Sequence, residues 1–214
     1  MAGTVFEHES RAILSIQAFL SKAKNPCLCF SGGKNSLVLL HMVQRLAQGT
    51  ITIIHIDTGA EFPAVRSHIQ KMKKLWKLNL IIEISGDNKG KGKNKETCCK
   101  QYLFEPLKNI IKSRKFDGVL IGETSGSKME LSNFLSSDVD PHIFLAQPLI
   151  SFTSHNIWEY IRSHNLPYCS LYEKGYLKID CEPCSLLDTS LENESVLHDE
   201  EARIKEKLKK LGYL

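Results

Sequence analysis

The sequence predicts an α/β fold: a single domain with a twisted, mostly parallel five-stranded sheet flanked by helices and a cysteine-bearing C-terminal segment. Three observations predict this class. Short apolar runs alternate with longer amphipathic runs, which implies right-handed βαβ units and a parallel sheet. The 214 residues suffice for one full α/β core. The chain shows neither an internal repeat nor a dividing linker. Residues 1–214 are therefore expected to form one domain, with its core in residues 25–185 and a helical tail at 191–214.

Five short apolar runs predict the strands. Residues 51–56, Ile-Thr-Ile-Ile-His-Ile, are the clearest example, because four of the six side chains are isoleucine, as in a strand buried on both faces. The predicted strands cover residues 27–31, 51–56, 80–84, 117–122 and 143–149.

Helices are predicted where apolar residues recur at helical spacing, and end signals limit them. Gly49 stops the second helix, Pro63 suits the first turn of the third, and Thr153 caps the fifth. Residues 123–142 are predicted to be irregular. The predicted helices cover residues 6–22, from the loop after the first strand to about 46, 63–77, 98–113, from 154 onward, and 197–211.

The loop after the first strand, Ser31-Gly32-Gly33-Lys34-Asn35-Ser36, is predicted to bind phosphate. It leads into a helix, whose first N–H groups have no partner within the helix and can bind an anion. The glycines let the backbone approach the anion, Lys34 adds a positive charge, and Ser31 and Ser36 add hydroxyl donors. The alternative is an ordinary glycine turn, but six matching residues in this context favour phosphate binding.

Two further polar stretches follow predicted strands. Asp57-Thr58-Gly59 follows the second strand, and Gly122-Glu123-Thr124 follows the fourth. Because ligands of parallel sheets bind at the carboxyl ends of the strands, both stretches are expected beside the phosphate loop. There the Asp57 carboxylate would meet a ribose hydroxyl or a metal, or it would cap its own turn, and the sequence leaves both roles open.

Seven cysteines are few for a secreted disulfide scaffold, so a cytoplasmic protein that keeps its thiols for chemistry is expected. Cys98 and Cys99 are adjacent, and Cys181 and Cys184 form a Cys-x-x-Cys pair within the Pro- and Cys-bearing segment 165–190. Three interpretations are open. The thiols hold a [4Fe–4S] cluster, they hold a structural zinc ion, or they are four unrelated buried thiols.

Charge and hydropathy limit the other classes. The net charge of +4 does not by itself imply nucleic acid, no apolar run approaches a membrane span, and the N-terminus lacks the apolar core of a signal peptide. Lysines and glycines alternate in residues 89–95 and predict a loop, which is either solvated or a flap over an anionic ligand.

The phosphate loop resembles the PP-loop, Ser-Gly-Gly-x-Asp-Ser, of the adenine-nucleotide α-hydrolase-like superfamily. Other motifs resemble the PAPS reductase family over about residues 25–185. The adjacent cysteines, with 81 residues between Cys99 and the second pair, resemble the pattern of cluster-containing adenylyl-sulfate reductases. The remaining motifs are His55 to Pro63, Glu105-Pro106-Leu107, Pro148 to Ile161, Asn165 to Tyr168 and Leu171 to Tyr176.

Three departures from the family pattern bear on the chemistry. Asn35 stands where the superfamily usually has an Asp that helps to hold Mg²⁺. Residues 122–127, Gly-Glu-Thr-Ser-Gly-Ser, stand where the reductases carry an Arg-Arg pair that would bind sulfate or phosphate, and Glu123 would repel an anion. No cysteine follows Cys184, whereas the reductases carry a nucleophilic cysteine in a C-terminal tail.

The resemblance implies an adenine-nucleotide-binding iron–sulfur enzyme of sulfur metabolism, similar to phosphoadenylyl-sulfate and adenylyl-sulfate reductases. One alternative is a PP-loop ATP pyrophosphatase that uses Mg–ATP to adenylate and thiolate a nucleic acid or small molecule. The other is a non-catalytic nucleotide-binding subunit. Lys34 and Cys169 are the candidates for a catalytic role, although Cys169 is more simply explained as a buried small residue.

The resemblance also implies ligands and partners. Cys98, Cys99, Cys181 and Cys184 would hold a [4Fe–4S] cluster, with zinc as the alternative. A thiol or ferredoxin-type protein would donate electrons. Under the ATP alternative, a nucleic acid is a partner. No membrane is expected, and an oligomer is compatible with the sequence. ATP, adenylyl sulfate (APS) or phosphoadenylyl sulfate (PAPS) would bind at Ser31, Gly32, Gly33, Lys34, Asn35, Ser36, Asp57, Thr58, Gly59 and Gly122.

Overall fold

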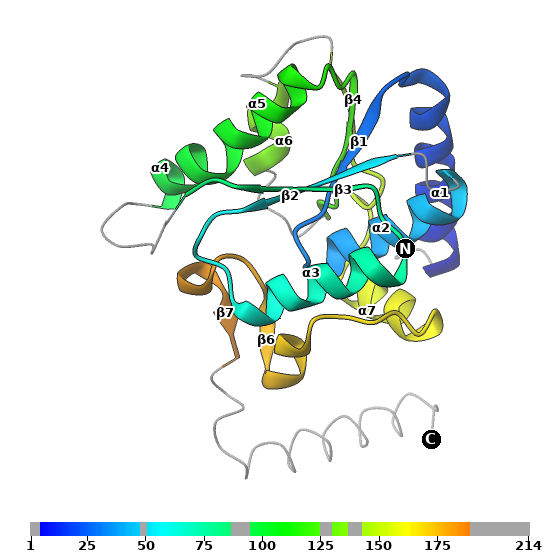
Figure 1. The fold of residues 1–214 in the computed structure, drawn as a ribbon. Helices are drawn as coiled ribbons and strands as arrows, with labels where there is room; N and C mark the ends of the chain where they lie inside the picture. The colour runs from blue at the N-terminus through cyan, green and yellow to red at the C-terminus, as the bar shows by residue number, and fades with distance from the viewer. Residues whose placement is uncertain (1–4, 48–50, 87–94, 125–129, 137–142, 189–214) are drawn as a thin grey trace, which may run out of the picture.

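A computed structural model of the chain describes residues 5–47, 51–86, 95–124, 130–136 and 143–188. Its main sheet has five strands in the order β3-β2-β1-β4-β5, and every neighbouring pair is parallel (Figure 1). The predicted α/β fold with a parallel five-stranded sheet is therefore confirmed. The strands are β1 (Pro26–Cys29), β2 (Thr52–Asp57), β3 (Leu80–Ile84), β4 (Gly118–Leu120) and β5 (Phe144–Ala146).

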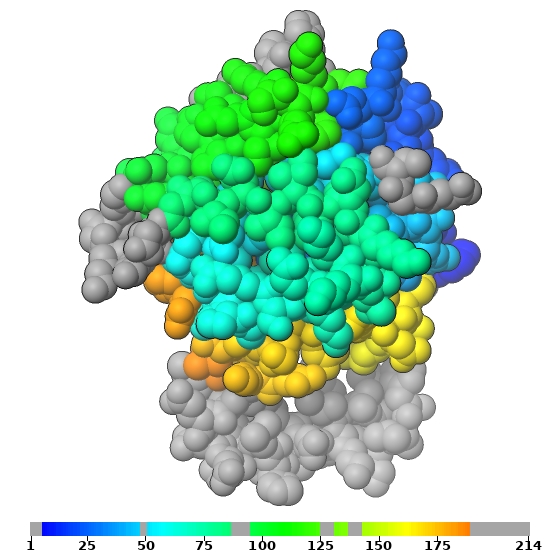
Figure 2. All heavy atoms as spheres, in the orientation of Figure 1, coloured from blue at the N-terminus to red at the C-terminus, as the bar shows by residue number. Residues whose placement is uncertain are grey.

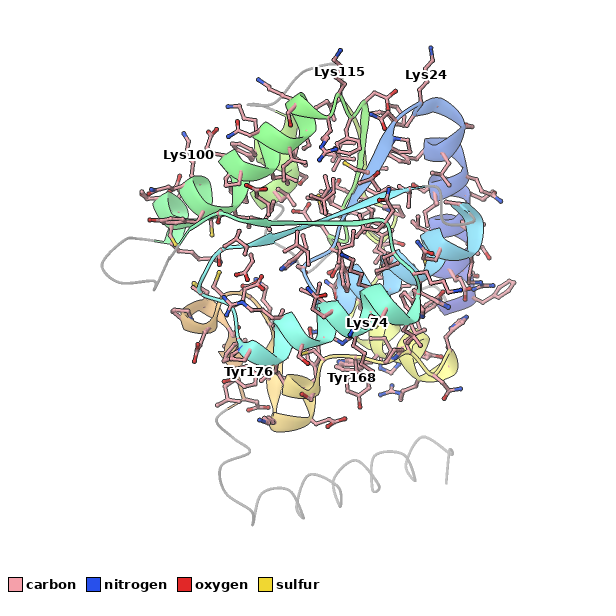
Figure 3. All side chains as sticks on the ribbon, viewed as in Figure 1. Lys24, Lys74, Lys100, Lys115, Tyr168 and Tyr176 are labelled. Carbon is pink, nitrogen blue, oxygen red and sulfur yellow. The ribbon has the colours of Figure 1, made fainter. Side chains whose placement is uncertain are left out.

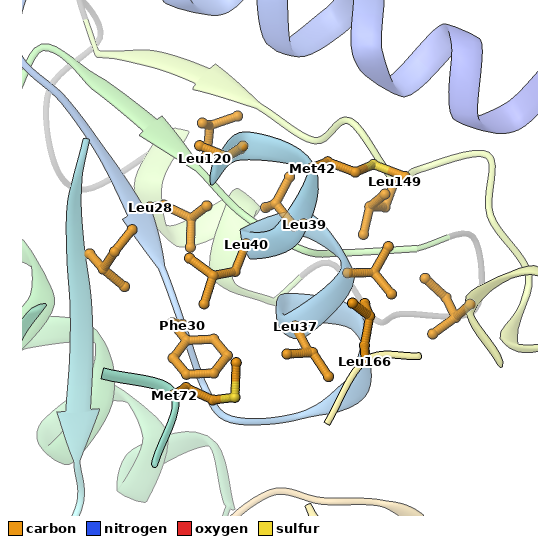
Figure 4. Close-up of a cluster of buried hydrophobic side chains, with 14 of the residues drawn as sticks. Leu28, Phe30, Leu37, Leu39, Leu40, Met42, Met72, Leu120, Leu149 and Leu166 are labelled. Carbon is orange, nitrogen blue, oxygen red and sulfur yellow. The ribbon is translucent and has the colours of Figure 1, made fainter. Parts of the chain in front are cut away.

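Helices cover both faces of the sheet, because side chains alternate between the faces along each strand. Leu28 of β1 packs on one face with α1 (Val5–Lys22), α2 (Lys34–Ala47), α3 (Pro63–Leu75) and α7 (Ser154–Ser163). Its neighbour Cys27 packs on the other face with α5 (Glu105–Ser113) and α6 (Glu130–Phe134). Figure 4 shows the first of these cores, where leucines of α2 and Phe30 fill the space under the sheet.

The strand order places a topological switch point beside β1. The chain runs from β1 through α2 to β2 and through α3 to β3, and it then returns past β1 to β4 on the other side. The connections after β1 and β4 therefore diverge at the carboxyl ends of these two strands. Ligands of open α/β sheets bind at such switch points.

The predicted helix at 98–113 is divided by a change in hydrogen bonding. It consists of α4 (Lys95–Cys99), the π-helical segment η1 (Lys100–Phe104) and α5. Pro106 has no N–H to donate to the carbonyl of Tyr102, four residues earlier, and the Ser85 hydroxyl donates to that carbonyl instead. The proline and this side-chain bond explain why the regular α-helical ladder is interrupted here.

Two regions without a predicted helix or strand, residues 123–142 and 165–190, contain short elements. Helix α6 lies within 123–142, and the Ser132 N–H near its start donates to the Glu123 carboxylate at 3.4 Å. Residues 165–190 contain the 3₁₀ segments η3 (Ser170–Lys174) and η4 (Glu182–Cys184) and an antiparallel pair, β6 (Tyr176–Lys178) and β7 (Leu186–Leu187). These elements are too short for a periodic pattern to reveal.

Other predictions differ only at the ends or lie outside the described residues. Strand β5 ends at Ala146, before Pro148, which cannot donate to a strand ladder. The predicted tail helix at 197–211 and nearly all of the loop at 89–95 lie outside the described residues. In the part of the chain that the structure describes, no helix has the length and apolar character required to cross a membrane.

Candidate nucleotide and metal site

Residues 31–36 turn the chain from β1 into the N-terminus of α2. Gly32 has a φ of +77°, in the left-handed region, and a Cβ at this position would lie 3.1 Å from Val65 Cγ1. Glycine is therefore required at position 32 for both backbone angle and space. A Cβ at Gly33 would meet its nearest neighbour, Ser31 Oγ, at 3.4 Å, which is an ordinary contact. The fold itself thus demands only the first of the two loop glycines.

Two serine hydroxyls fix the shape of this loop. Ser36 Oγ donates to the Gly33 carbonyl at 3.0 Å and accepts from the Ser31 N–H at 3.3 Å. The Ser31 and Ser36 hydroxyl oxygens lie 3.1 Å apart, and Ser31 Oγ accepts from the Gly33 N–H at 3.4 Å. The two hydroxyls that are predicted to donate hydrogen bonds to a phosphate therefore also hold the loop in its curved form.

Lys34 is directed toward the C-terminal segment. Its Nζ donates to the Leu177 carbonyl at 2.6 Å, and its backbone N–H donates to the Tyr172 hydroxyl at 2.8 Å. Burial lowers the pKa of Lys34, and the charge of Lys178 lowers it further. The loop is thus joined to residues about 140 positions away in the sequence.

The residues that follow β4 pack against the loop. A Cβ at Gly122 would lie 3.0 Å from the backbone N and Cα of Ser36, so only glycine allows this close approach. Asn35 Nδ2 donates to Thr124 Oγ1 at 3.4 Å. The Glu123 carboxylate accepts from Gln147 Nε2 at 2.6 Å as well as from Ser132. The carboxylate expected to repel an anion is therefore bound by two donors.

Asp57, at the end of β2, caps its own turn and forms an ion pair. Its Oδ1 accepts from the Gly59 N–H at 2.9 Å, and its carboxylate binds the Arg66 guanidinium at 2.6 and 3.0 Å. The Arg66 hydrogen bond lowers the pKa of Asp57, burial opposes it, and the Gly59 N–H lowers the pKa further. These contacts give Asp57 a structural role, and its predicted contact with a ribose or metal stays a prediction.

Behind Asp57 lies a buried histidine–carboxylate pair. His55 Nδ1 donates to the Phe30 carbonyl at 2.9 Å, and Nε2 lies 3.1 Å from Glu61 Oε2. Burial lowers the pKa of His55, but the hydrogen bond and charge of Glu61, with the Phe30 carbonyl and Asp57, outweigh it and raise the pKa overall. The raised pKa favours the form with a proton on both ring nitrogens, which would make an imidazolium–carboxylate ion pair with Glu61.

The second cysteine pair lies beside the residues that follow β2, at the same edge of the sheet. Cys181 Sγ lies 3.0 Å from Thr58 Oγ1, and the Glu182 N–H donates to the Ala60 carbonyl at 2.7 Å. Burial raises the pKa of Cys181, the Thr58 bond opposes it, and the charges of Cys184, Glu61 and Cys98 add to the increase. Cys98 and Cys181 are therefore close enough to interact electrostatically, although 82 residues separate them in the sequence.

The four predicted metal ligands do not form a closed single-ion site. Within the described ranges, no three Cys, His, Asp or Glu side chains converge as ligands of one ion would. Cys98, Cys99 and Cys181 are half-buried and Cys184 is exposed. Thiolates around a [4Fe–4S] cluster lie further apart than those around one ion, because irons and sulfides lie between them. Whether these four thiols hold a cluster or a zinc ion therefore stays a prediction.

The remaining thiols lie deeper in the fold. Cys169 is only 1% exposed, and burial raises its pKa, an effect that a backbone hydrogen bond with Leu171 partly opposes. Burial, with the charge of Glu123, raises the pKa of Cys29 to about 12. Raised pKa values disfavour the thiolate that a nucleophile requires. The structure therefore supports the interpretation of Cys169 as a buried small residue.

Sequence reasoning missed several residues that shape the site. Tyr172, Arg66 and Glu61 bind Lys34, Asp57 and His55, respectively. Tyr172 and Glu61 lie within motifs that resemble the reductases, but no pattern indicated which side chain each would contact. Arg66 lies one turn into the helix after Pro63, and only the structure directs it back to the end of β2.

The sheet order and the Ser-Gly-Gly loop at its switch point define the PP-loop class of α/β proteins. The model of the phosphoadenosine phosphosulfate reductase domain matches residues 25–187. The chain therefore belongs to the phosphoadenosine phosphosulfate (PAPS) reductase family, as its motifs predicted.

Two curated relatives show the extent of the similarity. Adenosine 5'-phosphosulfate reductase of Bacillus cytotoxicus is 26% identical over 191 residues, which cover 83% of this chain and 81% of that protein. An uncharacterized protein of Methanocaldococcus jannaschii is 26% identical over 205 residues, or 87% of this chain. The chain spans only 42% of the length of that second relative.

Solved structures agree on the fold. The PAPS reductase of Candida auris, solved as a phosphate complex, has a TM-score of 0.66 at 18% identity, covering 85% of this chain and 95% of that one. The U34-tRNA thiolase NcsA of Methanococcus maripaludis, solved with its [4Fe–4S] cluster, has a TM-score of 0.56 at 17% identity, covering 75% and 64%. At such identities the likeness establishes the shared architecture.

Proposed function

We propose that the chain is a sulfonucleotide reductase-like enzyme that binds APS or PAPS, with a nucleotide phosphate on residues 31–36. One observation carries this proposal: the Cys181 thiol lies 3.0 Å from Thr58 at the end of β2, on the same rim as the phosphate loop. Thiol ligands and an anion-binding loop thus adjoin each other. Membership of the PAPS reductase family supports a sulfur-bearing nucleotide as the ligand.

The loop can bind the phosphate without a metal ion. The N-terminus of α2 and the hydroxyls of Ser31 and Ser36 offer hydrogen-bond donors at the switch point. The Asn35 amide donates to Thr124, which follows β4, and could donate to a phosphate oxygen instead. A carboxylate at this position would need a cation between itself and the phosphate. An amide at position 35 therefore favours a sulfonucleotide over Mg–ATP.

The proposed reaction uses an external dithiol protein. One donor thiolate attacks the sulfur of the bound sulfonucleotide, the bond from sulfur to the phosphate oxygen breaks, and the adenine nucleotide leaves. The second donor thiol then displaces sulfite, which leaves the donor as a disulfide. The two electrons thus come from the donor. Sulfite and the free adenine nucleotide are the products.

A [4Fe–4S] cluster would be held by Cys98, Cys99, Cys181 and Cys184. When bound, it would tune the electrostatic environment of the sulfonucleotide. The chain's own contribution is to position the second pair, through Thr58 and through the hydrogen bond from Glu182 to Ala60. A cytoplasmic location suits both the thiol donor and the reduced cysteines.

A second candidate function is an ATP pyrophosphatase that adenylates and then thiolates its substrate. The observation that favours it is the end of β4, where residues 122–127 carry no arginine in place of the reductases' pair and the Glu123 carboxylate is bound by Gln147. In this alternative, Mg²⁺ supplies the positive charge that the missing arginines would otherwise provide, and a nucleic acid or small molecule accepts the adenylate. The non-catalytic subunit would bind a nucleotide and turn over none.

Asn35→Asp separates the two enzymatic candidates. If the ligand is a metal-free sulfonucleotide, the added negative charge beside its phosphate lowers APS affinity, by about tenfold or more. If the substrate is Mg–ATP, the carboxylate helps the metal and raises magnesium-dependent pyrophosphate release. We expect the first result in calorimetric titrations and pyrophosphate assays.

The matched control is Asn79→Asp. Asn79 hydrogen-bonds Thr52 at the amino ends of β2 and β3, away from the loop, and the variant adds the same charge. This variant should change neither the APS affinity nor the magnesium-dependent pyrophosphate release. Increased pyrophosphate release from Asn35→Asp, without loss of APS affinity, would replace the reductase proposal by the second candidate.

A further inference from the structure

The charged residue of the phosphate loop is already engaged by the C-terminal half of the chain. In addition to its bond with the Leu177 carbonyl, the Lys34 ammonium lies 5.2 Å from the ring centroid of Tyr172 and 6.0 Å from that of Trp158. A cation over aromatic faces is stabilised further where it is partly desolvated. The ammonium therefore has three attractive partners, all more than 120 residues away in the sequence.

The backbone of Lys34 is engaged by the same segment. Lys34 is the first residue of α2, and its N–H is one of the helix-start donors that would otherwise be available to an anion. The Tyr172 hydroxyl accepts this N–H at 2.8 Å. Burial keeps the pKa of Tyr172 well above its ordinary value, so the phenol remains neutral. Both the backbone and the side chain of Lys34 thus contact residues 172–177.

From there the chain leads directly to the second cysteine pair. After Leu177, Ile179 is buried in the core, and its carbonyl lies 3.8 Å from the position of a Gly33 Cβ. Cys181 then meets Thr58, and Glu182 meets Ala60. In Figure 1 this segment, which contains β6 and β7, runs below α3, and Figure 3 places Tyr168 and Tyr176 on the same side. Lys34 is therefore one of the attachment points of the segment, together with Thr58 and Ala60.

We propose that Lys34 is a positioning residue that fastens residues 172–184 onto the phosphate loop, and that it is not a ligand of the phosphate. Ligands at the loop and at the cysteines then influence each other through this contact. Such coupling is reciprocal, because each ligand shifts the other's affinity by the same factor. The mutual effect of the two ligands rests on the proposed function, whereas the attachment of residues 172–184 to the loop through Lys34 does not.

Hydrogen exchange on the ligand-free protein tests the fastening. Lys34→Met keeps most of the side-chain stem but removes the donor and the charge, so we expect amides of residues 172–184 to exchange about tenfold faster or more. Lys34→Arg, which keeps a donor and a cation over the rings, should restore slow exchange. Lys174→Met, an exposed lysine on η3, removes the same charge from the segment itself and should exchange as wild type does.

Calorimetry with APS on iron-loaded and iron-free protein tests the coupling. Wild type and Lys34→Arg should show affinities that differ by about fivefold or more between the two forms, and Lys34→Met should bring this ratio close to one. Unchanged exchange at 172–184 in Lys34→Met, with equal loss of APS affinity in both forms, would make Lys34 a phosphate ligand and overturn the proposal. If wild type binds no APS, the proposed function fails, but hydrogen exchange still decides the role of Lys34.

Discussion

The phosphate loop and the cysteine-bearing segment are stabilised in opposite ways. The two serine hydroxyls of residues 31–36 form hydrogen bonds between residues at most five positions apart, such as Ser36 with Gly33 and Ser31, whereas Lys34 and Asn35 reach beyond the loop. Residues 169–187 form short elements whose contacts reach across the chain, from Cys181 to Thr58 and from Leu177 to Lys34. In Figure 2 the gold-to-orange atoms of this segment lie directly below the cyan-to-turquoise residues of α3.

This difference shows which parts of the site form together. The loop's shape is a local property of its six residues and of the strand and helix that it joins. The cysteine positions depend on the completed sheet, because Thr58 and Ala60 follow β2. We therefore expect changes in the segment to leave the loop intact, whereas changes in the loop affect both regions.

The largest expected effect comes from Cys181→Ser, which should abolish the metal centre. Anaerobically purified wild type should be brown, with about four irons per chain, and the variant should contain almost none. Because the loop is formed locally, the variant should still bind APS. Iron and sulfide analysis together with calorimetry measures both results.

Cys169→Ser is the control, because Cys169 lies in the same segment but belongs to neither pair, and it should retain its iron. Stoichiometric zinc without sulfide in protein made under iron-replete conditions would contradict the cluster. Iron retained by Cys181→Ser would remove this residue from the ligand set.

A smaller effect distinguishes the two glycines of the loop. Gly32→Ala places a Cβ at positive φ against Val65 and Ile69, so it should lower the free energy of unfolding by about 2 kcal/mol. Gly33→Ala meets only ordinary contact distances and should lower it by less than about 1 kcal/mol. Urea denaturation of both variants measures the difference in their free energies of unfolding. Equal destabilisation would show that the loop's form is not set by position 32.

The smallest effect lies between the two regions, at the pair of Glu61 with His55. The pKa of His55 is raised in the folded state, so the stability that the pair contributes is fully present below the unfolded pKa of about 6.5 and is lost as pH rises through the folded value. Glu61→Gln should therefore destabilise the protein more at pH 6 than at pH 9, by about 1–2 kcal/mol at the lower pH. Denaturant unfolding at both pH values checks this. A larger loss at pH 9 would contradict the ion pair.

The sequence predicted most of the fold, because the apolar runs of the strands and the helix end signals are local features. Strand β2 and the loop at 31–36 lie where their patterns placed them. The division of the helix at 98–113 was missed, because it depends on the Ser85 hydroxyl, which comes from another part of the chain. Helix α6 was missed because five residues are too few for a periodic pattern.

The site was predictable as a set of residues but not as a set of contacts. The motif at residues 31–36 identified Lys34 as a cation that would bind phosphate. In the structure its ammonium binds the Leu177 carbonyl. The motif identified Asp57, and its partner Arg66 carried no signal of its own. Pairings between residues distant in sequence depend on how the segments fold over the sheet, and a single sequence does not record them.

Calorimetric titration of the anaerobically purified protein tests the central claim most directly. APS, PAPS and ATP would each be added in magnesium-free buffer, and ATP again with Mg²⁺. The account predicts that APS or PAPS binds without magnesium and that Gly122→Val, whose side chain would meet the Ser36 backbone, loses this binding. Binding of ATP only, and only with Mg²⁺, would contradict the account, and so would the absence of any adenine nucleotide binding to the folded wild type.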